Sequence, residues 1–313
     1  QLYITIEEKK GYTFRLGYSI NSSNAPMQNM ITLPQTDPMN VYYGNPDLKP
    51  SLLYNVNFNL ERMMSGQKSH TVSIHLSSTD NGIARGYIFN TLTGVRYYYP
   101  FNIDGNRNGM INYMFFTPFG KDNRFDISTS TTFSISKNVD MIGTTVETQD
   151  FVFNPDDQER RNIHTISARE HLNLRYTFAQ NTVSAFGNIN LYNYRSDDPG
   201  FTNFHSITGR YGVSGTFSLP LGINLSTDFN VFSRNGFTDD KLNTSDLIWN
   251  AQLSKPFLKG SIILSITGFD MLHQLNNILY TVTPQARTEI VRNVVPAKVL
   301  FKIQYRINKS PKR

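Results

Sequence analysis

The residues best suited to chemistry in this sequence are three pairs of adjacent aspartates, Asp156-Asp157, Asp197-Asp198 and Asp239-Asp240. Paired carboxylates can bind a divalent cation or transfer protons in a hydrolase. Each pair lies in a long polar segment, where a solvated loop tip is the usual role, and no partner carboxylate makes any of them a glycosidase site. We therefore expect loop residues here and no catalysis.

A second candidate is the segment Asp104-Gly105-Asn106-Arg107-Asn108-Gly109, which matches the first half of a calcium-binding loop, D-x-N-x-N-G. An EF-hand loop needs a bidentate glutamate at its twelfth position. That position is Phe115, so an EF-hand is excluded. A turn rich in glycine and asparagine is the simpler interpretation.

The other reactive residue types do not form a site either. The six histidines lack the spacing of a metal centre, and the absence of cysteine excludes disulfides and thiolate metal sites. The sequence contains no phosphate-binding glycine motif and no nucleophile elbow. We expect no enzyme activity, no metal and no cofactor.

Charge and composition exclude further classes. The net charge is +6, but the basic residues are scattered outside the tail residues Lys309, Lys312 and Arg313. Nucleic-acid binding needs a basic patch or stripe, so we expect no nucleic-acid partner. Aromatic residues make up 13% of the chain, which is too many for a disordered protein. Apolar runs are too short for a transmembrane helix, which needs about 20 residues.

Strict alternation of apolar and polar residues recurs along nearly the whole chain and predicts an all-β protein. In residues 54–60, for example, Asn55, Asn57 and Asn59 alternate with apolar residues. Charged residues such as Asp126 and Arg175 lie on the polar faces, and we expect the apolar faces to carry essentially no charge. The predicted strands have about 10 to 14 residues, long enough to cross a bilayer at a tilt, which takes about 9 to 11.

The connections between these strands alternate between short turns and long polar segments. The short turns are predicted at 8–11, 64–68, 119–123, 179–181, 219–222 and 255–259, and the long segments at 21–49, 137–162, 195–205, 235–246 and 271–286. A tight turn at 91–94 is the exception, and we expect it at the tip of two unusually long strands. Short turns on one side and long loops on the other are typical of outer-membrane barrels.

These patterns together predict an antiparallel, up-and-down transmembrane β-barrel with about 13 strands and a polar lumen. The odd strand count indicates an incomplete part of a larger barrel, because bacterial single-chain barrels have even strand numbers. We expect the earlier strands upstream of Gln1. We expect two aromatic girdles, one at each membrane interface. One consists of Tyr97, Tyr98 and Tyr99, and the other of Phe115, Phe116 and Phe119.

Several segments carry a family resemblance. Gly44, Asn45, Pro46, Leu48, Lys49 and Pro50 match the G-N-P-x-L-K-P-E motif of TonB-dependent outer-membrane receptors, with Ser51 in place of the glutamate. Asn102-Ile103-Asp104-Gly105 resembles a mid-barrel motif of the same group. Residues 249–306 resemble the closing strands of Bacteroidetes receptors of this type, and the ending resembles Y-R-F-N with Ile307 in place of phenylalanine.

The resemblance implies a bacterial outer-membrane protein in which residues 1–308 are the C-terminal part of a barrel of about 22 strands. Residues 309–313 are a short basic tail, and the plug domain and early strands are not in this chain. The implied function is uptake of a large or scarce nutrient, such as a glycan, a peptide or a metal chelate. The implied partners are the lipid bilayer, lipopolysaccharide, the protein's own plug domain, the TonB complex and a surface lipoprotein.

The polar faces offer candidates for substrate contact in the lumen, although a hydrated wall explains most such residues equally well. These candidates are Asn55, Asn57, Asn59, Arg175, Arg210 and Asp228. Two alternatives stay open at this level. One is an outer-membrane barrel that acts in envelope assembly or secretion, and the other is a soluble, secreted carbohydrate-binding β-sandwich, because a sandwich shows the same alternation.

Overall fold

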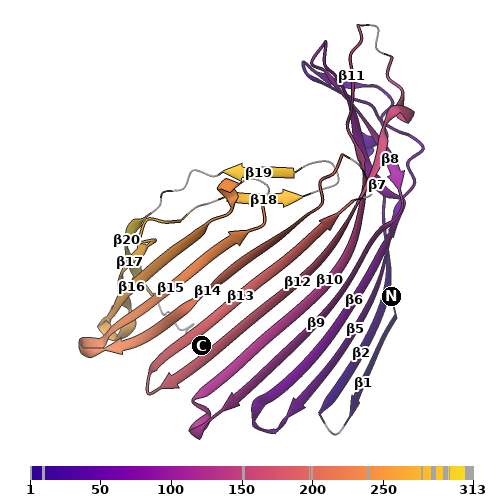
Figure 1. Ribbon diagram of the computed structural model, residues 1–313. Coiled ribbons are helices and arrows are strands. Elements are labelled where there is room, and N and C mark those ends of the chain that lie inside the picture. The colour runs from indigo at the N-terminus through magenta and orange to yellow at the C-terminus, as the bar shows by residue number, and fades with distance from the viewer. Residues whose placement is uncertain are drawn as a thin grey trace, which may run out of the picture.

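The computed structural model contains one large antiparallel sheet, shown in Figure 1 as a curved wall of long oblique strands. The described residues are 2–8, 11–149, 152–196, 198, 200–237, 240–275, 278–282, 287–291, 295 and 297–306. The basic tail 309–313, Gln1, Ile307, Asp197 and Asp239 lie outside them. The described residues include no helix that is long and apolar enough to cross a membrane.

The large sheet has 13 strands, and each inner strand pairs with the strands of this sheet that come before and after it in the chain. Its strands, in spatial order, are β1 (Leu2–Glu8), β2 (Tyr12–Ser23), β5 (Ser51–Met64), β6 (Lys68–Asp80), β9 (Asn106–Phe119), β10 (Phe125–Ile142), β12 (Glu159–Phe178), β13 (Asn181–Arg195), β14 (Phe204–Leu219), β15 (Ile223–Asn235), β16 (Ser245–Phe257), β17 (Ile262–Phe269) and β20 (Lys298–Tyr305). The predicted all-β, up-and-down architecture with about 13 strands is confirmed. The sheet is not closed, since β1 and β20 are its two edges among the described strands.

The register puts apolar residues of neighbouring strands on one continuous face. Phe58 in β5 is opposite Leu16 in β2 and Ile74 in β6, and the same parity holds from strand to strand. The asparagines between them share the other face with Ser73 and His75. Because side chains alternate strictly along a strand, this register gives the sheet one apolar face and one polar face.

The short turns all lie at one end of the sheet, which we call the turn end; the opposite end is the loop end. The turns contain single 3-10 turns at η2 (Ser65–Gln67), η3 (Lys121–Asn123), η5 (Pro220–Gly222) and η7 (Leu258–Gly260). Gly66 has a φ of 75°, which only glycine adopts without strain. The predicted sorting of connections is confirmed, with the last turn shifted because β16 continues to Phe257.

At the loop end, β10 and β12 are longer than predicted. They have 18 and 20 residues and stay paired as far as Ile142 opposite Glu159. The predicted long segment 137–162 is therefore reduced to residues 143–158, which include β11 (Thr144–Val146) and η4 (Pro155–Asp157). Alternation fades in this stretch because the strands leave the apolar band.

A second, five-stranded sheet corrects the prediction of two unusually long strands around 91–94. Its order is β11, β7 (Gly82–Asn90), β8 (Arg96–Ile103), β4 (Asn40–Tyr42) and β3 (Gln35–Asp37). The chain leaves the large sheet at Asn81, with φ 52°, and returns at Gly105, with φ 106°. These left-handed residues end the ladder of β6 and β9, so the hairpin joins segments 35–42 and 144–146 instead. In Figure 1 this sheet, which we call the loop-end sheet, stands above the wall.

A small buried core lies where the two sheets meet. It consists of Ala84, Ile103 and Val139, with Met141 packed against it. Elsewhere the large sheet is a single layer, and residues such as Ile135, with 51% of its surface exposed, face outward. A third sheet, the hairpin of β18 (Ile278–Val282) and β19 (Arg287–Val291), also lies on the loop side (Figure 1).

Aromatic residues form a girdle at the turn end of the apolar face, which includes Phe115 and Phe119 but not Phe116, because Phe116 is opposite Ser128 on the polar face. The ring of Phe125 stacks on Phe119 at 5.4 Å and on Tyr176 at 4.4 Å, measured between ring centroids. The predicted girdle of Tyr97, Tyr98 and Tyr99 is wrong. These three residues belong to β8 in the loop-end sheet, because the left-handed residues at Asn81 and Gly105 remove this hairpin from the wall.

The expectation that the apolar faces carry essentially no charge is wrong: basic residues lie on this face near its two ends, and one acidic residue lies between them. Glu170 lies in the middle of β12, opposite Thr131 in β10 and Ile189 in β13, and so on the apolar face. Its two carboxylate oxygens accept hydrogen bonds from the hydroxyl groups of Thr129 and Thr131. The alternation pattern conceals this residue because its neighbours Arg169 and His171 are polar as well, so the sequence does not mark the face on which Glu170 lies.

Candidate functional site

The loop-end sheet presents a dense cluster of aromatic rings on both of its faces. Tyr98 of β8 stacks on Tyr42 of β4 with centroids 4.9 Å apart, and also contacts Tyr87 of β7. On the opposite face, Phe153 stacks on Tyr43 at 4.4 Å and lies beside Tyr99. Strand alternation separates the two clusters, because successive residues of β8 point to opposite faces.

A pocket of about 250 Å³ opens beside the Tyr42–Tyr98 stack. Its lining residues are Gln28, Asn29 and Gln35, which carry amides, the tyrosines Tyr42, Tyr43 and Tyr98, and Arg85. Arg85 Nη2 donates a hydrogen bond to Asn29 Oδ1 at 2.5 Å. We call this site the tyrosine pocket.

The electrostatics of the tyrosine pocket favour a polar ligand with hydrogen-bonding groups. Burial raises the pKa of Tyr98, although nearby Arg96 opposes the shift. Burial likewise raises the pKa of Tyr43. The Tyr98 phenol therefore keeps its proton at neutral pH and can donate a hydrogen bond to a ligand. Aromatic rings beside amides and one guanidinium suit a sugar or a peptide with a carboxylate.

The two sequence motifs of the family resemblance contact each other, and the first of them is bonded to the pocket residue Asn29 through Asn45 N and Asn29 O. Lys49 N donates to Asn102 Oδ1 at 2.7 Å, and Asn102 Nδ2 donates to Lys49 O at 3.0 Å. Asn45 Nδ2 donates to Pro100 O at 3.1 Å, and Leu48 is buried. Segment 44–50 is thus held against the end of β8. We call this arrangement the staple; it orients the loop that carries Asn29 and Tyr42.

The segment 104–109 does not have the geometry of an ion-binding loop. Asp104 Oδ1 accepts a hydrogen bond from Asn81 N at 2.6 Å, and Asn106 Oδ1 accepts one from Val139 N at 2.7 Å. These oxygens are used to join β6, β9 and β10 at the point where the chain re-enters the wall. Within the described residues, no group of three metal-ligating side chains occurs.

The aspartate pairs lie at the loop end, as predicted, insofar as the structure describes them. Asp156 and Asp157 form η4, where Asn154 caps the turn by accepting from Asp156 N at 3.2 Å. Asp198 pairs with Arg161, and Asp240 begins η6 (Asp240–Leu242). Each described member is a loop residue with a local structural role.

The predicted lumen residues all lie on the polar face but belong to separate groups. Asn55, Asn57 and Asn59 follow one another along β5, where they bond to side chains of neighbouring strands. The shortest of these contacts joins Asn57 Oδ1 to His75 Nδ1 at 2.6 Å. Arg175 lies near the turn end and forms an ion pair with Asp126 at 3.0 Å.

Arg210 and Asp228 are brought close through the buried residue Asn230. Arg210 Nε donates to Asn230 Oδ1 at 3.0 Å, and Asn230 Nδ2 donates to Asp228 Oδ2 at 2.8 Å. Asp228 also lines a pocket of about 360 Å³ on the polar face together with Asn250 and Lys302. Substrate contact by these lumen residues stays a prediction.

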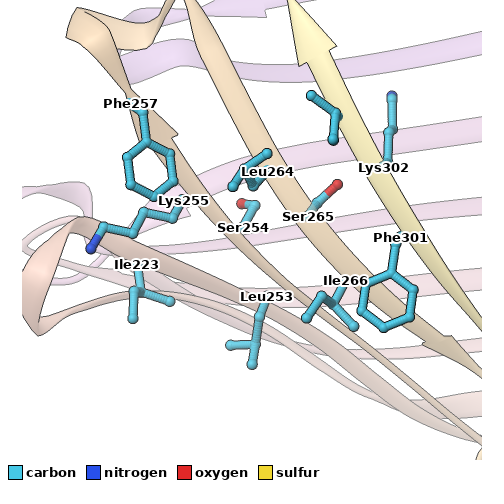
Figure 2. Close-up of a pocket in the computed structure, with 11 residues that line it drawn as sticks. Ile223, Leu253, Ser254, Lys255, Phe257, Leu264, Ser265, Ile266, Phe301 and Lys302 are labelled. Atoms are coloured by element: carbon cyan, nitrogen blue, oxygen red, sulfur yellow. The ribbon is translucent and has the colours of Figure 1, made fainter.

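A larger groove of about 410 Å³ lies on the opposite face of the same strands (Figure 2). Leu253, Leu264, Ile266 and Phe301 line it, and Lys255 lies at its side. Its lining is almost entirely apolar and belongs to the apolar face, so it does not suit a polar nutrient.

Sequence reasoning missed the tyrosine pocket and a second aromatic group near the loop end of the polar face. In that group Tyr194 stacks on Tyr192 at 5.9 Å and on Phe204 at 4.8 Å, and Arg169 Nη2 donates to the Tyr192 hydroxyl at 3.4 Å. Local signals existed, namely the run Tyr97-Tyr98-Tyr99 and the tyrosines inside an asparagine-rich strand. The hydrogen bond between Arg85 and Asn29, which are 56 positions apart, had no such signal in the sequence.

Comparison with known proteins agrees with this geometry. Residues 2–183 match the model of the "Outer membrane protein beta-barrel family", which is more than half of the chain. No curated protein and no solved structure matches the chain. A soluble β-sandwich is therefore wrong as an interpretation, since the single large sheet has an exposed apolar face on one side and a polar face on the other. The chain belongs to the outer membrane protein β-barrel family, and its wall of strands lies in the bacterial outer membrane.

Proposed function

We propose that this chain forms the barrel wall and part of the extracellular capture surface of a TonB-dependent nutrient receptor of the Bacteroidetes type. The observation that carries the proposal is the staple. Two segments that resemble receptor motifs, 44–50 and 102–105, are 53 residues apart at Lys49 and Asn102, and they contact each other through reciprocal hydrogen bonds. A shared structural role explains why both motifs occur in one chain.

The polar face supports the same proposal. A wall of 13 strands that is polar along one face suits a wide, hydrated lumen, and barrels of about 22 strands hold a plug inside such a lumen. The plug domain, the TonB complex and a surface lipoprotein that covers the loops are the partners that this function requires.

The nutrient contacts belong to the tyrosine pocket under this proposal. Long loops face the cell exterior in outer-membrane barrels, so the pocket meets a nutrient before the lumen does. The ring of Tyr98 offers a flat apolar surface, and Arg85 with Gln28 and Asn29 offers directional hydrogen bonds. A glycan or a peptide fits this chemistry better than a hydrophobic compound does.

The test is an uptake experiment in the source bacterium with the gene deleted and then restored. Cells are grown on single nutrients from three classes, namely glycans, peptides and ferric chelates. We expect the deletion to abolish growth on one class at limiting concentration, and an uncoupler to abolish uptake of the same nutrient. The double variant Arg85→Ala/Tyr98→Ala should raise the concentration needed for half-maximal growth by roughly tenfold, about 1.4 kcal/mol of binding free energy.

A matched control is Arg124→Ala, which changes an exposed arginine in a turn at the opposite end of the wall. It should leave growth unchanged. The competing function is a role in envelope assembly or secretion. A deletion that leaves every uptake rate unchanged, yet makes cells sensitive to detergent, would replace the proposal with that function.

A further inference from the structure

Four basic residues lie side by side on the outward, apolar face of the wall near its loop end. Arg107 of β9 is directly opposite Lys137 of β10, Lys137 is opposite His164 of β12, and His164 is opposite Arg195 of β13. They therefore cross four adjacent strands in one line, about 14 Å long at the usual strand spacing. We call these four residues the basic row.

The basic row is a costly arrangement unless an anion neutralises it. Like charges directly opposite each other on neighbouring strands destabilise a sheet, because their Cβ atoms are about 5 Å apart. Among the described residues, the five ion pairs all involve other side chains. Arg195 Nε donates to Asn193 Oδ1 at 3.0 Å, which is a neutral acceptor. The row therefore keeps a net positive charge.

Below the basic row lies a mostly apolar platform, in which Asn193, next to Arg195 on β13, is a polar member. Phe133 and Ile135 of β10, Ile166 of β12 and Leu191 of β13 share its face, and each exposes 43% to 51% of its surface. Charge above and apolar surface below are complementary to an amphiphile with anionic groups at the membrane surface and acyl chains beneath. A free phosphate ion would use the row but not the platform.

We infer that the basic row binds the phosphate groups of a phosphorylated glycolipid of the outer leaflet, namely lipopolysaccharide. The level of the row fits this ligand, because the loop end faces the cell exterior and the row lies where the apolar band ends. Lysine and arginine are the usual partners of phosphate oxygens, and neighbouring strands can hold more than one phosphate at once. Basic residues that each extend to the membrane surface on their own would not need to lie opposite one another on four neighbouring strands. The alignment of the basic row therefore favours one shared ligand.

This inference depends on the outer-membrane location and not on nutrient transport. The staple and the tyrosine pocket can fail as a receptor site while the row still binds glycolipid. At the turn end, Lys255 also lies on the apolar face but is opposite Leu264, and so it provides a matched single charge in the other leaflet.

The experiment measures the lipopolysaccharide that stays bound when the full-length protein is extracted from its own outer membrane with mild detergent. Native mass spectrometry counts bound molecules, and 3-hydroxy fatty acid analysis quantifies them. The triple variant Arg107→Gln/Lys137→Gln/Arg195→Gln should retain at most one fifth of the wild-type amount. The charge-preserving variant Arg107→Lys/Lys137→Arg/Arg195→Lys and the control Lys255→Gln should retain the wild-type amount.

Folding is checked in each variant by the shift in gel migration on heating. A folded triple variant with the wild-type amount of glycolipid would overturn the inference. A second measurement uses the wild-type protein alone, so that it does not depend on variant folding. Delipidated protein is titrated with intact and with enzymatically dephosphorylated lipopolysaccharide, and with phosphatidylglycerol vesicles. We expect at least tenfold tighter binding of the intact glycolipid; equal binding of the dephosphorylated form, or preference for phosphatidylglycerol, would contradict it.

Discussion

Lys49 and Asn102 exchange two hydrogen bonds that fasten the loop after β2 to the end of β8. The Lys49 amide donates to Asn102 Oδ1, and Asn102 Nδ2 donates both to Lys49 O and to Asn81 O at 2.9 Å. One side chain thus satisfies three backbone groups from two segments. Because Asn81 is the residue at which the chain leaves the wall, the same side chain also fixes the start of the loop-end sheet.

Replacing Asn102 by alanine should loosen this loop without unfolding the wall. Three backbone groups lose their partner, and each can cost about 1 kcal/mol when it is not fully solvated. We expect amide exchange in residues 44–50 to rise at least tenfold, while exchange in β12 and β13 stays unchanged. The control Asn138→Ala removes an exposed asparagine of β10. Unchanged exchange in 44–50 would show that the staple is held by other contacts.

Gly44 begins the staple at a point with no room for a side chain. A Cβ atom there would lie 2.1 Å from the carbonyl oxygen of Ile31, so the backbone must shift. Gly44→Ala should destabilise the loop by about 1 to 3 kcal/mol and make residues 24–50 accessible to protease in intact cells. Gly187→Ala is the matched control, because its nearest neighbour would be the Tyr211 Cβ at 4.0 Å. Equal protease resistance of both variants would disprove the steric argument.

Acid should release the loop between β13 and β14. The hydrogen bond from Arg161, and then that from the Gly200 amide, lower the pKa of Asp198. A carboxyl group with a lowered folded-state pKa stabilises the fold above its unfolded value, about 3.9, and that contribution is lost as the pH falls through the folded value. Amide exchange in residues 196–204, corrected for intrinsic rates, should therefore accelerate below about pH 4.

The variant Asp198→Asn keeps the shape of the side chain and removes the titration. Its exchange in the same loop should be faster than wild type at pH 7 and should change little with acid. A wild-type loop that exchanges at the same corrected rate at pH 3 and pH 6 would show that the Arg161–Asp198 pair does not hold it.

The wall was predictable from sequence because its determinants are local. Alternation sets the strands, and residues such as Gly66 set the turns, so neighbours in sequence become neighbours in space. The loop-end sheet was not predictable in this way. It depends on left-handed residues at Asn81 and Gly105, and asparagine and glycine are too common in this chain for two of them to signal a change of sheet.

The candidate sites also divide into those that local sequence determines and those that depend on contacts between distant segments. Asn55, Asn57 and Asn59 could be assigned to the polar face from their spacing alone, and the register confirms that face. The tyrosine pocket needs β4 beside β8, which are parallel neighbours separated by more than 50 residues. The basic row needs strands longer than those predicted, since Lys137 and Arg195 are the first residues of two segments that were predicted as long loops.

Glu170 should destabilise the folded barrel. Its carboxylate lies on the lipid-facing side midway along β12, and acidic side chains on the lipid face destabilise barrels by up to about 2 kcal/mol near the midplane. The hydroxyl groups of Thr129 and Thr131 offset part of this cost by donating to its two oxygens. Glu170→Leu should therefore raise the free energy of unfolding in lipid vesicles by about 1 to 2 kcal/mol, measured by urea titration.

The matched variant Thr131→Val removes one donor and should lower stability by about 1 kcal/mol, because it leaves a carboxylate oxygen without a partner in the membrane. In the Glu170→Leu background the same change should cost almost nothing, since the two residues then no longer interact. If Glu170→Leu instead destabilises the barrel, the carboxylate has a stabilising partner within the bilayer. Cross-linking from position 170 in intact outer membranes would then identify it.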